Sequence, residues 1–186
     1  NKTLSINEIF LLAVKKHQQN KTDVAQKLYS QVLKINQNHV DAHNNLGVIF
    51  KNLGENEKAI DCYEKAIAIN PNYVNAHNNL GLVFKNLGEN EKAIDCYEKA
   101  IAINPNYVDA YNNLGIIFDK LGQNQKAIDC YEKAITINPN HPNAHNNLGV
   151  ILKKIGQNQK AIDCYEKAIA INPNYVNTHN NLGIIF

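Results

Sequence analysis

Arginine is absent from this chain of 186 residues, so all 19 of its basic side chains are lysines. Arginine's planar fork is the group that binds phosphates, carboxylates and base edges with two parallel hydrogen bonds. The net charge of +2 is close to neutral and implies no strong attraction to nucleic acid or to a membrane surface. We therefore predict that the chain binds no nucleic acid and no membrane.

Long apolar runs and enzyme motifs are also missing. No stretch of about 18 apolar residues is present, so no segment is expected to span a membrane as a helix. The sequence contains no glycine-rich phosphate loop, no H-E-x-x-H and no paired C-x-x-C. Its two serines, Ser5 and Ser30, do not lie in a nucleophile elbow. We expect no catalytic residue and no cofactor, and we predict that the chain is not an enzyme.

Histidine pairs are the one pattern that suggests a metal. His39 and His43 are four residues apart, as are His141 and His145, a spacing that suits two ligands on one continuous helix. Pro142 interrupts the second pair, however, and the first pair crosses a predicted helix start. No cysteine or carboxylate completes either site, so we interpret these histidines as packing residues and expect no metal.

Cysteine occurs only four times, at a constant interval along the chain: Cys62, Cys96, Cys130 and Cys164. Equivalent positions on stacked helices should lie about 10 Å apart, which is too far for a disulfide. Free cysteines that serve as small packing residues are typical of a reducing compartment. We therefore predict a cytoplasmic protein.

The dominant feature of the sequence is an internal repeat. The segment Val40–Tyr73 returns as Val74–Tyr107 with three differences, which are Asn75 for Asp41, Leu82 for Val48 and Val83 for Ile49. A fixed period of this length, about 34 residues, indicates an array of stacked helix pairs.

The period divides the chain into six parts. We predict a degenerate capping repeat at 1–39, full repeats at 40–73, 74–107, 108–141 and 142–175, and a half repeat at 176–186 that contains only a first helix. Because Leu182, Ile185 and Phe186 would leave an uncovered apolar face, we expect the natural chain to continue.

Each repeat is predicted to form two helices. Ala42, Leu46, Ile49, Phe50 and Leu53 have the spacing of one helix face. The glycine that follows them, Gly54, suits a left-handed C-terminal cap.

The second helix of the repeat is predicted to start with an asparagine cap at Asn56 and to end before Pro71. Thr22 occupies the same capping position in the degenerate repeat. Asp61 and Lys65 form an acid-to-base pair on its exposed face, and the pair recurs in the later repeats.

Small residues should let the helices approach closely. Gly47, Ala59 and Ala66 are predicted to form the notches that Phe50 and Tyr63 fill. This pattern favours antiparallel helix hairpins, each stacked on the next.

The repeated residues resemble the tetratricopeptide repeat (TPR) family. The family pattern appears here as His43-x-x-Leu46-Gly47-x-x-Phe50, followed by Ala59-x-x-x-Tyr63-x-x-Ala66 and Pro71. Histidine or tyrosine replaces the tryptophan that the family favours at the first position. The resemblance implies an all-α fold, a right-handed superhelical solenoid of antiparallel helix hairpins, in which the first helices line a concave groove.

Ligands of the family usually lie along this groove, which makes the chain a candidate scaffold for an extended peptide segment. The array is similar to the TPR region of O-GlcNAc transferases, where an asparagine ladder holds a peptide backbone. A carboxamide offers both a donor and an acceptor and can pair with any peptide unit. The predicted peptide-binding residues are Asn44, Asn45, Asn78, Asn79, Asn112, Asn113, Asn146, Asn147, Asn181, Lys51 and Lys85.

Three alternatives remain open at the level of sequence. The asparagines could be structural, with side chains that bond to neighbouring helices. The chain could be the substrate-recruiting region of a larger, glycosyltransferase-like enzyme. It could also associate with itself through an exposed C-terminal helix.

Overall fold

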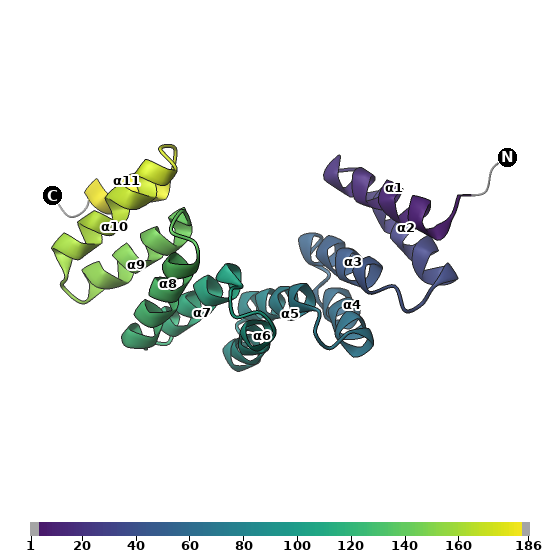
Figure 1. Ribbon diagram of the computed structural model, residues 1–186, viewed down its shortest axis with the longest axis horizontal. Coiled ribbons are helices and arrows are strands. Elements are labelled where there is room, and N and C mark those ends of the chain that lie inside the picture. The colour runs from purple at the N-terminus through teal and green to yellow at the C-terminus, as the bar shows by residue number, and fades with distance from the viewer. Residues whose placement is uncertain (1–3, 184–186) are drawn as a thin grey trace. The chain divides into compact units, whose positions relative to one another are not determined.

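The computed structural model describes residues 4–183, which form eleven helices and no strand. The helices alternate between the first member of a hairpin, here called the A helix, and the second, the B helix (Figure 1). The A helices are α1 (Ile6–Gln18), α3 (Val40–Asn52), α5 (Val74–Leu87), α7 (Val108–Lys120), α9 (Pro142–Lys154) and α11 (Val176–Gly183). The B helices are α2 (Thr22–Ile35), α4 (Asn56–Ile69), α6 (Asn90–Ile103), α8 (Asn124–Ile137) and α10 (Asn158–Ile171). The predicted all-helical fold of packed hairpins is confirmed.

The chain divides into two compact units, residues 1–99 and 100–186. Within the first unit α1 packs on α2 and α3 on α4, and α4 packs on the next A helix, α5. Within the second unit α7 packs on α8, α8 on α9 and α9 on α10. Within each unit, consecutive hairpins therefore contact each other, as expected of a repeat array. The right-handed sense of the superhelix stays a prediction.

A left-handed residue ends the A helix of each hairpin, as predicted for Gly54. Its φ angle is +77°, a conformation that costs glycine little because it lacks a Cβ atom. The N–H of the next residue, Glu55, donates to the carbonyl of Phe50 at 2.9 Å and closes the helix end. In the degenerate first repeat the same position is Asn20, with a φ angle of +56°. Asparagine is among the few other residues that tolerate this conformation.

The predicted asparagine cap of the B helix is wrong. Helix α4 begins at Asn56 itself, the cap residue is Glu55, and no side chain caps this end. The first repeat behaves in the same way, since α2 begins at Thr22 after the uncapped residue Lys21. The physical reason is the tight turn at Gly54, which leaves only Glu55 between that glycine and the start of α4. The predicted end of the B helix is confirmed, because α4 stops at Ile69 before Asn70 and Pro71.

Five tyrosines are the largest fully buried side chains of the core: Tyr29, Tyr63, Tyr97, Tyr131 and Tyr165. The predicted notch is confirmed for Tyr63, whose ring lies directly on Gly47. A Cβ atom added to Gly47 would lie 2.7 Å from Cε1 of this ring. The other large residue of the prediction, Phe50, is only half-buried, and the ammonium of Lys58 lies 5.4 Å from its ring centroid. Tight glycine–tyrosine contacts therefore fix the distance between the two helices of a hairpin.

Two surface predictions need correction. Leu53, predicted on the apolar face of its helix, is 51% exposed because it lies at the helix end, beside the turn. The acid-to-base pair holds for Asp61 and Lys65, at 2.7 Å, and for its copy in α6. In α8 and α10 the aspartates accept a hydrogen bond from the glutamine four residues earlier, Gln125 or Gln159.

None of the helices in residues 4–183 is both long and apolar enough to cross a membrane.

Candidate functional site

Two neighbouring asparagines recur on every A helix from α3 onward, and the structure separates them into two classes. The inner asparagines are the first of each pair in the four full repeats and are buried: Asn44, Asn78, Asn112 and Asn146. The first asparagine of α11, Asn180, is exposed. The outer asparagines are the second of each pair and are half-buried: Asn45, Asn79, Asn113, Asn147 and Asn181. Only the outer class reaches the surface to an appreciable extent.

Hydrogen bonds join the outer asparagine of one repeat to the inner asparagine of the repeat before it. The Nδ2 group of Asn79 donates to Oδ1 of Asn44 at 3.0 Å. In the second unit Asn147 donates to Asn112 at 3.1 Å, and Asn181 donates to Asn146 at 3.1 Å. These bonds, here called rungs, connect consecutive A helices. The asparagines therefore have a structural role, made through neighbouring side chains.

The first rung has a different partner, and the degenerate repeat explains why. The position equivalent to Asn44 is Phe10, which offers no acceptor. The Nδ2 group of Asn45 donates instead to the hydroxyl oxygen of Tyr29 at 3.3 Å. The same outer position thus finds a polar partner in the preceding hairpin even where the inner asparagine is missing.

The rungs use only part of the hydrogen-bonding capacity of the outer asparagines. A carboxamide carries two N–H donors and an oxygen with two lone pairs. In Asn79, Asn147 and Asn181 the rung takes one N–H. The oxygen of Asn147 also accepts from Asn146 at 3.3 Å. Each of the three side chains keeps one N–H and at least one lone pair, which is what pairing with a peptide unit requires.

The predicted lysines lie further along the A helices, toward their C-terminal ends. The residue at this position is a lysine in the first unit, but its charge is not constant in the second. Lys51 and Lys85 are half-buried, and burial lowers the pKa of Lys85. In the second unit the same position holds Asp119 and then Lys153. The carboxylate of Asp119 forms an ion pair with Lys154 at 2.8 Å. A uniform strip of lysines along the A helices is therefore excluded.

A second set of links between repeats was not foreseen from the sequence. The hydroxyl of Tyr73, just before α5, donates to Oδ1 of Asp41 at the start of α3, at 2.6 Å. Tyr175 donates to Asn143 in the same way at 2.7 Å. In the repeat just before Tyr175, His141 lies 3.7 Å from Asp109 and lowers the pKa of that carboxyl. The sequence did contain a signal for these links, because a tyrosine or histidine recurs at a constant interval after a polar residue.

The histidines have structural roles at their own helix starts. Nε2 of His43 and of His77 lies 2.8 Å from the carbonyl oxygen six residues earlier, on Gln37 and Pro71. His39 accepts the backbone N–H of Ala42 through Nδ1 and so caps α3. Residues 4–183 contain no group of three His, Cys, Asp or Glu side chains placed to hold a metal ion.

The four cysteines are free thiols. Burial raises the pKa of Cys62 and of Cys96 to about 11, so both stay protonated at neutral pH. A protonated, buried thiol is a weak nucleophile and a poor metal ligand.

Comparison with known proteins identifies the class to which this arrangement belongs. A family model described as TPR repeat matches residues 15–54, 49–88 and 85–122, and a second, described as Tetratricopeptide repeat, matches 108–141 and 142–175. The chain belongs to the tetratricopeptide repeat family, whose fold mediates protein–protein interaction. No curated protein sequence matches it significantly.

Solved structures agree with this assignment. The crystal structure of MamA is 30% identical over 88% of this chain and 96% of its own, with a TM-score of 0.76. YrrB, described as a TPR protein with an unusual peptide-binding site, is 21% identical over 95% of this chain and 91% of its own, with a TM-score of 0.71. PilF of Pseudomonas aeruginosa is 19% identical over 97% of this chain and 88% of its own, with a TM-score of 0.82. The resemblance to O-GlcNAc transferases finds no support in these comparisons.

Proposed function

We propose that the chain binds an extended peptide segment of another protein along its A helices. In each unit the outer asparagines present amide groups to the peptide backbone, Asn45 and Asn79 in the first unit and Asn113, Asn147 and Asn181 in the second. The observation that carries the proposal is the spare bonding capacity of half-buried carboxamides that the rungs already hold in place. A pre-positioned side chain loses little further entropy when a ligand binds.

The inner asparagines have a supporting part in this proposal. Asn44, Asn78, Asn112 and Asn146 are buried, and Asn44, Asn112 and Asn146 accept the rungs and so orient the outer amides. Lys51 and Lys85 lie further along the A helices and would contact acidic groups of a peptide on the first unit, whereas in the second unit Asp119, paired with Lys154, interrupts the lysines. The proposed recognition is of the backbone at every repeat, with charge selectivity that differs between the units.

Self-association through the C-terminal helix has no support of this kind. Of the residues that suggested it, Leu182 is half-buried, and Ile185 and Phe186 lie outside the described residues.

The test begins with the selection of peptides that bind the whole chain from a displayed library of short random sequences. The affinity of the strongest peptide is then compared for two double variants. Asn79→Ala with Asn147→Ala removes two rungs and two outer amides. Asn44→Ala with Asn112→Ala removes the same two rungs but keeps the outer amides.

We expect the outer pair to weaken binding about thirty-fold, given about 1 kcal/mol for each of two lost hydrogen bonds. The inner pair should change it by less than about three-fold. Equal weakening by both pairs, or none by either, would show that the asparagines only hold the helices together. Circular dichroism and thermal melting of each variant confirm that the fold is retained.

A further inference from the structure

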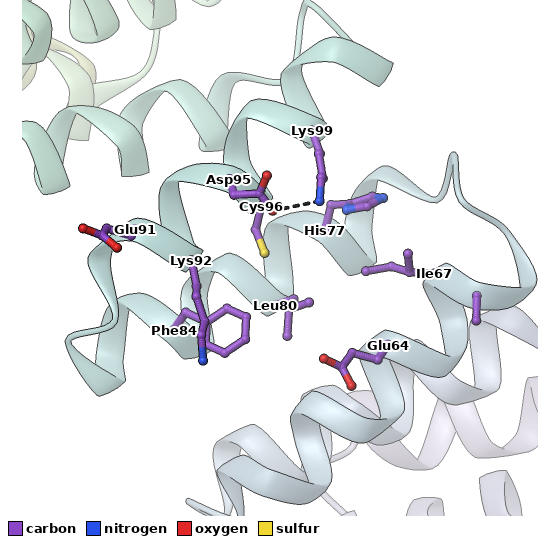
Figure 2. A pocket seen from close by; sticks show the side chains of 11 residues that line it. Glu64, Ile67, His77, Leu80, Phe84, Glu91, Lys92, Asp95, Cys96 and Lys99 are labelled. Atoms are coloured by element: carbon purple, nitrogen blue, oxygen red, sulfur yellow. Dashed lines mark hydrogen bonds and ion pairs between the residues drawn. The ribbon is translucent and has the colours of Figure 1, made fainter.

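A cleft of about 600 Å³ opens among α4, α5 and α6 of the first unit (Figure 2). Its floor is apolar and is formed by Leu80 and Phe84 of α5 together with Cys96 of α6. Ile67 and Ala68 of α4 form one wall. None of the asparagines that carry the proposed peptide site lines it, so it is a separate surface.

The cleft follows from how the repeats pack. In the second unit α8 and α10 both pack on α9 but not closely on each other. A cleft of about 440 Å³ lies there, lined by the equivalent residues Leu148, Leu152 and Cys164. On α5 and on α9, apolar side chains that are themselves largely buried thus line a cleft between two B helices. The two clefts are matched in their lining and origin, which allows one to serve as a control for the other.

The charge around the two clefts differs strongly. Residues 55–65 carry four acidic and two basic side chains, a net charge of −2, and residues 89–99 carry the same set. The equivalent segments of the second unit, 123–133 and 157–167, carry two of each and are neutral. The cleft of the first unit therefore lies between two acidic helices in a chain whose net charge is +2.

The lysines at the rim form ion pairs with neighbouring carboxylates, whereas Glu64 and Glu91 form none in the described part of the chain, although the charge of Glu64 helps to raise the pKa of Lys92. Lys92 pairs with Glu89 at 2.6 Å, and Lys99 pairs with Asp95 at 2.8 Å. Among residues 4–183, no ion pair or hydrogen bond involves the side chain of Glu64 or Glu91. Figure 2 shows Glu64 reaching toward Leu80 from α4, while Lys92 and Cys96 lie on the far side of the cleft. An apolar floor below unpaired carboxylates suits a ligand that is apolar and cationic at once.

We propose that this cleft is a second docking site, and that its occupant is an amphipathic segment of a partner protein with lysine or arginine beside apolar side chains. The apolar side chains pack on Leu80 and Ile67, and the cations pair with Glu64 and Glu91. The cleft of the second unit lacks part of this charge, since Gln159 of α10 stands at the position of Glu91. The chain would then hold two segments at once, one on the A helices and one between B helices.

The test uses a fluorescein-labelled helical peptide built from leucine and lysine, long enough for several helical turns, and a second peptide with glutamate in place of lysine. Fluorescence anisotropy at about 50 mM salt gives the affinity for the whole chain. The variant Glu64→Gln with Glu91→Gln removes the unpaired carboxylates. Glu132→Gln is the matched change in the other cleft, and Asn79→Ala tests the A-helix site.

We expect the lysine peptide to bind the chain more tightly than the glutamate peptide does. The double variant should weaken binding about five-fold, by the value of two surface ion pairs, and Glu132→Gln and Asn79→Ala by less than about two-fold. Ala68→Lys, which places a cation in the cleft, should weaken it as well. Three results would overturn the proposal: an equal loss of affinity with Glu132→Gln, equal affinity for the glutamate peptide, or an affinity that the double variant leaves unchanged.

Sedimentation without peptide tests the remaining occupant, a second copy of the chain. A mass that rises with concentration in the wild type but not in the double variant would assign the cleft to self-association and contradict the proposal. A mass that does not change with concentration in the wild type or in the double variant supports a partner of different sequence.

Discussion

Tyr29 and Tyr63 occupy the same position in successive repeats, but their hydroxyl groups have different surroundings. The hydroxyl of Tyr29 accepts a hydrogen bond from Asn45. The buried hydroxyls of Tyr63 and Tyr97 have no hydrogen-bond partner in the part of the chain that the structure describes. The reason lies in the preceding repeat. Asn79 bonds to Asn44, whereas the residue equivalent to Asn44 in the first repeat is Phe10, so Asn45 bonds to the tyrosine instead.

This difference predicts opposite responses to the same substitution. Tyr63→Phe removes an unsatisfied buried hydroxyl and should leave the free energy of unfolding unchanged or raise it by up to about 1 kcal/mol. Tyr29→Phe breaks a hydrogen bond and should lower it by about 1 kcal/mol. Urea denaturation of the two variants measures both changes. A larger loss for Tyr63→Phe than for Tyr29→Phe would mean that the Tyr63 hydroxyl is bonded.

The rungs are the feature that belongs to the scale of the helix. An amide-to-amide bond joins α7 to α9 through Asn112 and Asn147, and another joins α9 to α11 through Asn146 and Asn181. Thr178 adds a third bond, to Asn146, at 3.0 Å. Because the acceptor residues are buried, loss of these bonds should cost more than loss of an exposed hydrogen bond does.

We predict a coupling free energy of about 1 kcal/mol between Asn112 and Asn147, measured by urea denaturation of Asn112→Ala, Asn147→Ala and the double variant. Asn147 and Asn45 belong to different units and share no partner, so their alanine substitutions should be additive within about 0.5 kcal/mol. Additivity in the first pair would show that the rung contributes nothing to stability.

Local steric rules let the sequence predict most features of a hairpin. Gly54, Pro71 and the contact of Tyr63 with Gly47 each depend on neighbours within one repeat, and all three are confirmed. The predicted cap at Asn56 is wrong because the turn geometry, and not residue preference, decides where α4 begins.

The candidate site was less predictable from the sequence. Asparagine at two adjacent positions identified a polar strip, but the division into inner and outer roles depends on the distance between consecutive A helices. No pattern within one repeat contains that distance. The link from Tyr73 to Asp41 was missed for the same reason, since it connects the starts of two successive A helices.

At the scale of the whole chain, near-identical repeats carry different charge. The B helices of the first two full repeats differ from those of the next two mainly in glutamate against glutamine, as at Glu91 and Gln125. Their cores are alike, with the same buried alanines and tyrosines. One scaffold thus combines a repeated strip of asparagines with a surface whose charge varies along the chain.

The central claim is that the outer asparagines hold the helices and still bind a ligand. The most direct test follows the side-chain amide signals of the asparagines by ¹⁵N–¹H NMR while the peptide selected from the library is added. We predict that the signals of Asn45, Asn79 and Asn147 shift, while those of the buried residues Asn44 and Asn112 shift much less. Shifts confined to the B helices, or a titration that leaves every asparagine amide unchanged, would contradict the account.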